Sequence, residues 1–299
     1  GGGFMVHRQT DGSVGSIDFR EKAPIAAHQD MYLDEKGDVI SGLSQEGHLA
    51  VGVPGTVDGM VQIHSKFATM NWADLVAPAI GLAEKGFKLT SQGAGSLNSS
   101  YGSFEDNNHK EITVLAQDKW EEGNHITFPD LANTLKLISI NGREGFYGGS
   151  VADKIVAEMI KSDGLITHED LNRYSAVWRE AIETSYNGHK VITMPLPSSG
   201  GVSLVQLLKG AEQIDMAQWD HNSTSHIHYM TELQRRAYAD RAEWLGDPDF
   251  VEVDVARLTS SDYIQNRNSY IDAQNKTDSQ DIKPGAVSTI ESFETTHFS

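Results

Sequence analysis

Residues 181–201 read AIETSYNGHKVITMPLPSSGG, and this stretch indicates the fold class because it contains the strongest hairpin signal in the chain. Two strand-like runs, 181–186 and 190–194, flank Asn187-Gly188, a dipeptide that favours the tight turn of a two-residue β-hairpin. The PLPSSGG sequence that follows can open a helix, and its paired glycines can present backbone N–H groups to an anion. Taken alone, we interpret this turn as a simple helix cap.

Similar patterns extend outward in both directions. Strand-like runs at 4–8 and 14–20 surround a turn at Asp11-Gly12 and predict another hairpin. Apolar residues at three- and four-residue spacing predict helices over 56–67, 71–85, 129–140, 150–160 and about 225–244. Polar sequence predicts an exposed loop at 98–109, a turn at 145–149 and a linker at 272–284. No repeat and no clean domain boundary is evident, so we predict one compact α+β unit.

The composition excludes several classes of protein. The 299 residues contain 24 Lys and Arg against 42 Asp and Glu, a net charge of −18 that repels phosphate backbones and anionic lipids. We therefore expect no nucleic acid partner. No run of about 18 apolar residues is present, so no membrane span is predicted. The absence of cysteine excludes disulfides, zinc–thiolate sites and cysteine nucleophiles.

Charged residues on the predicted helix at 225–244 raise the question of a metal or catalytic centre. His221, His226 and His228 cluster near its start, but only His228 and Glu232 have the four-residue spacing that aligns two ligands on one face. We interpret the histidines as surface polar residues and expect neither a metal nor a cofactor. We interpret the remaining charges as a salt-bridged face rather than a catalytic cluster; they are Arg235, Arg236, Asp240, Arg241 and Glu243.

Eight short motifs, taken together and in this order, resemble the γ-glutamyltranspeptidase (glutathione hydrolase) family over essentially the whole chain. They are GGGFM (1–5), DFREKAP (18–24), VPGTV (53–57), GLIT (164–167), PSSGG (197–201), AYADR (237–241), LGDPDF (245–250) and ETTHFS (294–299). The resemblance implies the fold of the N-terminal-nucleophile hydrolases, an αββα sandwich of which this chain is a partial, helix-rich part.

The resemblance also implies a precursor that cuts itself between Glu294 and Thr295, so that Thr295 becomes the N-terminal nucleophile of a small subunit. Residues 1–294 are then expected to be a large-subunit portion without its beginning, and residues 295–299 the first residues of the small subunit. A threonine hydroxyl is a weak nucleophile until a base takes its proton, and a free N-terminal amine can be that base. Because the Thr295 amine is locked in an amide here, we expect this chain alone to be inactive.

By the same resemblance, Arg20 is the arginine that binds the α-carboxylate of the γ-glutamyl donor, and Glu21 orients it. A planar guanidinium suits a carboxylate because it makes two parallel charge-assisted hydrogen bonds. The residues alone favour a plain salt bridge from Arg20 to Glu21 or Asp18. The resemblance further implies glutathione or other γ-glutamyl compounds as donors, with water, amino acids or peptides as acceptors. It also implies a small subunit from the same precursor as partner, and a periplasmic or secreted location.

Two alternatives remain open at this point. One keeps the fold but changes the acyl group, as in related cephalosporin or glutaryl acylases and capsule transpeptidases. The other is an inactive fragment of the precursor that binds without turnover. Arg20 favours the γ-glutamyl reading, because a free α-carboxylate is what a guanidinium recognises.

Overall fold

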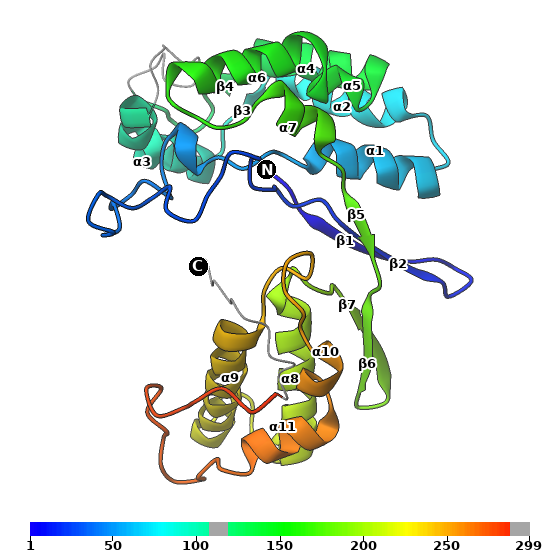
Figure 1. Cartoon of the computed structure of the whole chain (residues 1–299). Coiled ribbons are helices and arrows are strands. Elements are labelled where there is room, and N and C mark those ends of the chain that lie inside the picture. Colours follow the sequence, from blue (N-terminus) through cyan, green and yellow to red (C-terminus); the bar gives the residue numbers. More distant parts are fainter. Residues whose placement is uncertain (108–118, 288–299) are drawn as a thin grey trace. The chain divides into compact units, whose positions relative to one another are not determined.

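The structure, a computed structural model, describes residues 1–107 and 119–287 (Figure 1). Contacts within the chain group it into two compact units, whereas the sequence was interpreted as one. The first unit comprises Gly1–Gly3 and Phe19–Val177, and the second comprises Phe4–Asp18 and the described part of Trp178–Ser299. The chain therefore passes between the units three times, and no single composition shift marks a boundary.

The first unit is mainly helical. Its helices are α1 (Thr56–Phe67), α2 (Trp72–Lys85), α3 (Ser91–Asn107), α4 (Pro129–Asn141), α5 (Glu144–Tyr147), α6 (Gly149–Lys161), α7 (His168–Arg173) and the short 3₁₀ helix His48–Ala50. A two-stranded ladder pairs β3 (Phe87–Lys88) with β4 (His125–Ile126). Helix α2 packs against α4, where the Trp72 indole donates to the Ile138 carbonyl at 2.9 Å. The helices predicted at 56–67, 71–85, 129–140 and 150–160 are confirmed to within one residue at each end.

Local signals explain how α4 begins and ends. Pro129 stands in its first turn, where a missing N–H costs no hydrogen bond. Gly142 follows its last residue with φ 57°, in the region that glycine adopts without strain. Both ends of the helix are thus set by backbone preferences of single residues.

The loop predicted at 98–109 is wrong for its described part, because α3 continues to Asn107. Tertiary contacts offset the poor helix propensity of this Ser-, Gly- and Asn-rich segment. The Asn98 side chain accepts from the Trp120 amide and donates to the Trp120 carbonyl, both at 2.8 Å. Ala94 packs in the same cluster as Trp120 and Ile126. The turn predicted at 145–149 is partly helical, since α5 spans Glu144–Tyr147.

The strands of the second unit confirm both predicted hairpins. Strands β1 (Phe4–Arg8) and β2 (Val14–Asp18) pair antiparallel, and β2 lies next to β5 (Val177–Arg179). Strands β6 (Ile182–Tyr186) and β7 (His189–Thr193) form the second hairpin, with Tyr186 opposite His189. Its two turn residues have positive φ, 47° at Asn187 and 78° at Gly188, as the favoured two-residue turn requires.

The helices of the second unit pack around α8. They are α8 (Ser199–Ile214), α9 (Thr224–Trp244), α10 (Val255–Leu258), α11 (Ser261–Asn268) and the 3₁₀ helix Met216–Gln218. Val202 of α8 is fully buried with Leu258, Tyr263 and Ile264. The predicted helix at about 225–244 is confirmed as α9, whereas the full extent of α8 was not predicted. Gly201 is required by packing, because an added Cβ would lie 1.9 Å from the Met194 carbonyl oxygen.

Residues 272–287, here called the tail segment, contain no helix or strand, as the predicted linker implies. They are nevertheless fixed to one face of α9. The Glu232 carboxylate accepts from the Thr277 amide at 2.9 Å and from the Thr277 hydroxyl at 2.6 Å. Eight residues further along both segments, the Asp240 carboxylate accepts from the Gly285 amide at 2.8 Å. The Trp244 indole then donates to the Gly285 carbonyl at 2.9 Å.

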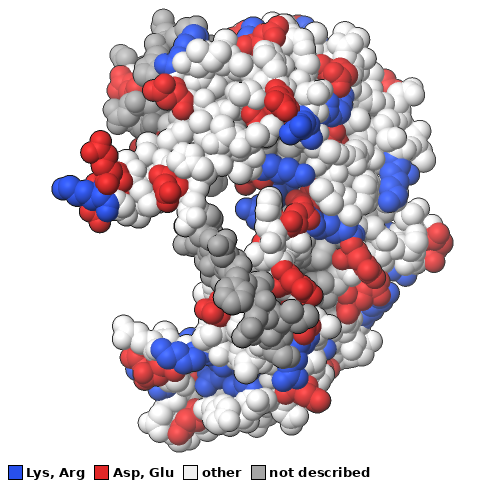
Figure 2. All heavy atoms as spheres, viewed as in Figure 1, with Lys and Arg blue, Asp and Glu red and all other residues white. Residues whose placement is uncertain are grey.

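The surface carries mixed charge. Acidic and basic side chains are interspersed on the face drawn in Figure 2. That face therefore presents no continuous basic footprint of the kind that binds a polyanion. Among the described helices, none has both the length and the apolar character needed to cross a membrane.

Candidate functional site

The four predicted site residues fall into two groups. Arg20 and Glu21 lie in the first unit, in the stretch that follows β2. Glu294 and Thr295 lie outside the described residues, so the cleavage site and the nucleophile remain predictions. The candidate site that can be built from structure is therefore the Arg20 segment, residues 19–22.

The Arg20 side chain is half-exposed and stands beside Glu21. Its Nη2 atom lies 3.8 Å from Glu21 Oε1, an ion pair longer than a hydrogen bond, and the two side chains are 47% and 44% exposed. Such a pair contributes little to stability. The Asp18 carboxylate, the other partner considered for Arg20, binds Arg179 Nη2 at 2.9 Å.

The main chain of the Arg20 segment is fixed on both sides. Phe19 exchanges two hydrogen bonds with Gly3, N to O at 2.9 Å and O to N at 3.2 Å. Lys22 exchanges two with Val53, at 3.1 and 2.8 Å. Phe19 itself is buried, at 6% exposed. The segments GGGFM, DFREKAP and VPGTV, which are far apart in sequence, therefore meet around Arg20.

Glycines make this approach of three segments feasible. A Cβ added to Gly2 would lie 2.5 Å from Arg20 Cα, and one added to Gly59 would lie 2.3 Å from Phe19 Cγ. At Gly55 it would lie 1.9 Å from the Tyr174 hydroxyl and 2.2 Å from the Phe19 carbonyl oxygen. Real Cβ atoms do not come this close to other atoms, so the motif glycines are a packing requirement of the Arg20 segment.

A buried polar network, which no sequence motif indicates, supports the same region. Asp58 is 3% exposed; its Oδ1 accepts from Arg143 Nε at 3.0 Å and its Oδ2 from the Ala176 amide at 2.7 Å. The Arg143 guanidinium lies over the Tyr147 ring, 4.6 Å from its centroid. Burial raises the pKa of Tyr147, so its hydroxyl keeps its proton at neutral pH. Asp58 lies 85 positions from Arg143 and 118 from Ala176, so no local pattern marks the contacts that join them.

Two family-like motifs of the second unit have structural roles. The Arg179 guanidinium makes a fork on Asp249 of the LGDPDF motif, at 3.0 and 2.9 Å. Asp240 of the AYADR motif is 3% exposed and accepts from the Tyr263 hydroxyl at 2.9 Å, besides its bond to Gly285. The salt-bridged face predicted for α9 is confirmed at Arg235 and Arg236, which both pair with Glu232, although Arg236 and Asp240 are buried rather than surface residues.

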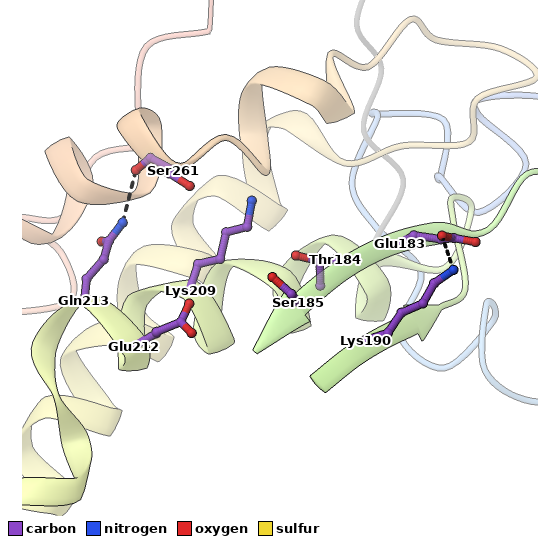
Figure 3. A pocket seen from close by; sticks show the side chains of 8 residues that line it. All are labelled: Glu183, Thr184, Ser185, Lys190, Lys209, Glu212, Gln213 and Ser261. Atoms are coloured by element: carbon purple, nitrogen blue, oxygen red, sulfur yellow. Dashed lines mark hydrogen bonds and ion pairs between the residues drawn. The ribbon is translucent and has the colours of Figure 1, made fainter. Parts of the chain in front are cut away.

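An open hollow in the second unit lies between the β6–β7 hairpin and helices α8 and α11 (Figure 3). Its volume is about 680 Å³, and its lining is polar. The charged side chains that line it already have partners: Lys190 contacts Glu183 at 2.6 Å, Lys209 donates to the Thr259 carbonyl at 2.7 Å, and Glu212 accepts from the Asn187 amide at 2.9 Å. No feature of this hollow therefore indicates a ligand.

Of the three histidines near the start of α9, one contacts the tail segment and the other two lie near each other. The His228 ring nitrogen Nε2 lies 2.8 Å from the Asp272 carbonyl oxygen, and the His221 and His226 rings lie 5.5 Å apart. Within residues 1–107 and 119–287, no group of three His, Asp or Glu residues has the arrangement of a metal site.

Comparisons with known proteins show which family this chain resembles. The family model described as gamma-glutamyltranspeptidase matches residues 1–299. A glutathione hydrolase proenzyme of Pseudomonas sp. (strain A14) is 43% identical, over 100% of this chain and 52% of the relative. The crystal structure of Helicobacter pylori gamma-glutamyltranspeptidase is 39% identical, with a TM-score of 0.91 over 95% of this chain and 82% of that chain. At lower identity, 34%, the acylase ACY 1 proenzyme of Pseudomonas sp. (strain SE83) matches 92% of this chain and 50% of its own length.

These likenesses give the chain the predicted fold class, that of the N-terminal-nucleophile hydrolases. Within that class, the chain belongs to the gamma-glutamyltranspeptidase family. It spans about half the length of the curated relatives that it matches.

Proposed function

We propose that the complete protein is a γ-glutamyltransferase and glutathione hydrolase that cleaves γ-glutamyl amides through a threonyl ester. The observation that carries the proposal is the match of the whole chain to the family, including the three segments that meet around Arg20. The donors are glutathione or other γ-glutamyl compounds, and the acceptors are water, amino acids or peptides.

Arg20 binds the donor α-carboxylate in this proposal. Its guanidinium can make two parallel hydrogen bonds to a carboxylate, and its side chain is half-exposed on a main chain that is fixed on both sides. A ligand carboxylate would bind at hydrogen-bond distance, which Glu21 at 3.8 Å does not. Glu21 is therefore the side chain that orients the guanidinium before the donor arrives.

Thr295 serves both maturation and turnover. In the precursor its hydroxyl oxygen attacks the Glu294 carbonyl carbon, and the peptide bond to the Thr295 nitrogen breaks as an ester to the hydroxyl oxygen forms. Water then hydrolyses this ester, which leaves a Glu294 carboxylate and a free Thr295 amine. When Thr295 attacks a γ-glutamyl amide, that amine takes the hydroxyl proton and passes it to the leaving amine as the amide C–N bond breaks. Each donor therefore passes through the same kind of ester, which water or an acceptor amine then opens.

The small subunit released from the same precursor, beginning at Thr295, is the proposed partner of residues 1–294. The family resemblance also supports a periplasmic or secreted protein. Both statements concern the complete precursor rather than the 299 residues described above.

The maturation step is tested with the complete precursor and its Thr295→Ala variant. The unchanged precursor should split without added protease, and the variant should remain one chain because it has no hydroxyl to form the ester. Gel electrophoresis with N-terminal sequencing of the smaller product measures this. A small product that begins at a residue other than Thr295 would contradict the assignment.

Donor recognition is tested with Arg20→Ala and Arg20→Lys in the matured enzyme. Arg20→Ala should reduce kcat/KM for a γ-glutamyl anilide by about 10- to 100-fold, because charge-assisted hydrogen bonds contribute about 1.5–3 kcal/mol. The kcat/KM of Arg20→Lys should lie between those of the wild type and Arg20→Ala, since lysine keeps the charge but cannot make two parallel hydrogen bonds. An unchanged kcat/KM in Arg20→Ala would overturn the donor-binding role of Arg20.

The similarity to an acylase proenzyme supports acylase activity as a second candidate, for which the family resemblance suggests glutaryl amides as substrates. A glutaryl group differs from a γ-glutamyl group only in lacking the α-amino group, so Arg20 suits the carboxylate of both. Assay of γ-glutamyl and glutaryl anilides side by side separates the candidates. Faster hydrolysis of the glutaryl compound would favour the acylase.

A further inference from the structure

Tyr174, near the C-terminal end of the first unit's sequence, contacts the main chain of Arg20. Its hydroxyl donates to the Arg20 carbonyl oxygen at 2.7 Å, across 154 positions of sequence. Tyr174 is 3% exposed, and its contact with the Arg20 carbonyl is partly buried. Removing a donor from a partly buried hydrogen bond costs free energy.

The Tyr174 ring is itself held in place. It stacks on the Tyr147 ring with centroids 5.7 Å apart and planes within 5°. The Tyr147 hydroxyl donates to the Pro54 carbonyl at 2.7 Å, and Arg143 Nη2 donates to the Tyr174 carbonyl at 2.7 Å. The hydroxyl therefore points at Arg20 from a position that both its ring and its main chain determine.

The arrangement separates a fixed part of Arg20 from an accessible part. Gly2 packs against Arg20 Cα, Tyr174 binds the carbonyl, and the neighbouring Phe19 is bonded to Gly3. Beyond the main chain, the side chain is 47% exposed. A long arginine side chain loses much rotamer entropy when it binds a ligand, and a fixed Cα confines that loss to the side chain.

We propose that Tyr174 is a positioning residue for donor recognition, because its hydroxyl fixes the carbonyl of Arg20 and thereby the point from which the guanidinium reaches the donor α-carboxylate. This inference rests on the proposed donor-binding role of Arg20. Tyr174 itself touches no donor, so its removal should weaken recognition of the α-carboxylate and leave the chemical step unchanged.

The experiment measures a preference rather than an activity. The matured complete enzyme is assayed with γ-glutamyl anilide and with 4-aminobutanoyl anilide, which is the same amide without the α-carboxylate. The ratio of the two kcat/KM values is the α-carboxylate preference. Tyr174→Phe should lower this ratio about 3- to 10-fold, through a higher KM for the γ-glutamyl donor at unchanged kcat.

Four further variants make the result specific. Arg20→Ala should abolish the preference, and the double variant with Tyr174→Phe should show no additional loss. Tyr263→Phe is the matched control, because it removes another buried tyrosine hydroxyl, 2.9 Å from Asp240 in the second unit, and should keep the wild-type preference. 4-Aminophenylalanine at position 174, a weaker donor, should give a preference between those of the wild type and Tyr174→Phe.

The outcomes separate this inference from the function on which it rests. If Arg20→Ala keeps the preference, the donor-binding role of Arg20 is wrong and the role of Tyr174 falls with it. If Arg20→Ala loses the preference but Tyr174→Phe keeps it, or slows both donors equally, only the positioning role is overturned. If Tyr174→Phe does not fold, the aminophenylalanine enzyme decides: a wild-type preference there overturns the proposal.

Discussion

The Arg20 segment of the first unit and the tail segment of the second unit differ in the kind of contact that holds them in place. Both are stretches outside the helices and main strands, and both are fixed by residues far away in the sequence. The Arg20 segment is held by peptide groups, a tyrosine hydroxyl and glycines that permit close approach. The tail segment is held by the carboxylates of Glu232 and Asp240.

This difference predicts whether acid or an added methyl group disturbs each segment more. Neutral contacts depend on shape, so the Arg20 segment should tolerate acid but not an added methyl group. Buried carboxylates depend on charge, so the tail segment should be sensitive to neutralisation. The Glu232 carboxylate shows this most clearly: burial raises its pKa, but hydrogen bonds from Thr277 and Arg236 outweigh burial and lower the pKa to about 2.

The largest expected effect is that of Glu232→Gln in the tail anchor. Glu232 is 1% exposed and pairs with Arg235 at 2.9 Å and Arg236 at 2.7 Å, so the amide would leave two guanidinium groups without their carboxylate. We expect the complete protein to lose about 3–5 kcal/mol of unfolding free energy in urea titrations. Glu243→Gln, an exposed carboxylate on the same helix, is the control and should change it by less than about 0.5 kcal/mol. Equal losses of unfolding free energy in Glu232→Gln and Glu243→Gln would show that the tail segment does not depend on the buried Glu232 carboxylate.

Acid should loosen the tail segment in a defined window. Because the folded pKa of Glu232 is about 2 against its ordinary 4.5, its stabilisation is complete above pH 4.5 and is lost as the pH falls towards 2. The shift corresponds to roughly 3 kcal/mol. Hydrogen exchange of the Thr277 amide, corrected for intrinsic rates, should accelerate on the order of 100-fold in this window.

Two amides sharpen this acid test. The Phe19 amide, whose acceptor is the Gly3 carbonyl, should keep its protection to lower pH than the Thr277 amide. In Glu232→Gln the pH dependence at Thr277 should disappear, because no carboxylate remains to be protonated. If the Phe19 amide lost its protection at a higher pH than the Thr277 amide, the neutral contacts of the Arg20 segment would be the weaker ones in acid.

The smallest of the three effects concerns shape. Gly55→Ala places a methyl group against the Tyr174 hydroxyl and the Phe19 carbonyl, and should cost about 1–3 kcal/mol of unfolding free energy. Gly81→Ala, inside α2 with nothing within 4 Å of the added Cβ, should stabilise by about 0.5–1 kcal/mol. The same substitution thus has opposite signs at the two sites. A neutral Gly55→Ala would mean that the Arg20 segment adapts its shape readily.

Sequence patterns predicted the elements whose causes are local. Asn187-Gly188 specifies its own turn, and regular apolar spacing specifies α1 and α4. Helix α3 was missed because its sequence is poor in helix formers, and its stability depends on contacts such as the pair between Asn98 and Trp120.

The residues of the candidate site also divide into those that a local sequence signal indicates and those that only long-range contacts define. Arg20 was found through a motif in continuous sequence. Tyr174 and Asp58 were not, because their contacts with Arg20, Arg143 and Ala176 span 85 or more positions. Glu232 was considered as a metal ligand beside His228, since spacing on a helix cannot tell that its partners are Thr277 and two arginines.

The place of β2 beside β5 has a consequence for the timing of synthesis. The Ser16 hydroxyl donates to the Arg179 carbonyl at 2.7 Å, across 163 positions. At about 5–20 residues per second, a ribosome needs roughly ten to thirty seconds to make the partner strand. An isolated two-stranded hairpin is marginal in water. During that interval β1 and β2 have been translated with one edge still unpaired, so the nascent chain offers other strands a site for mispairing until residue 179 has emerged.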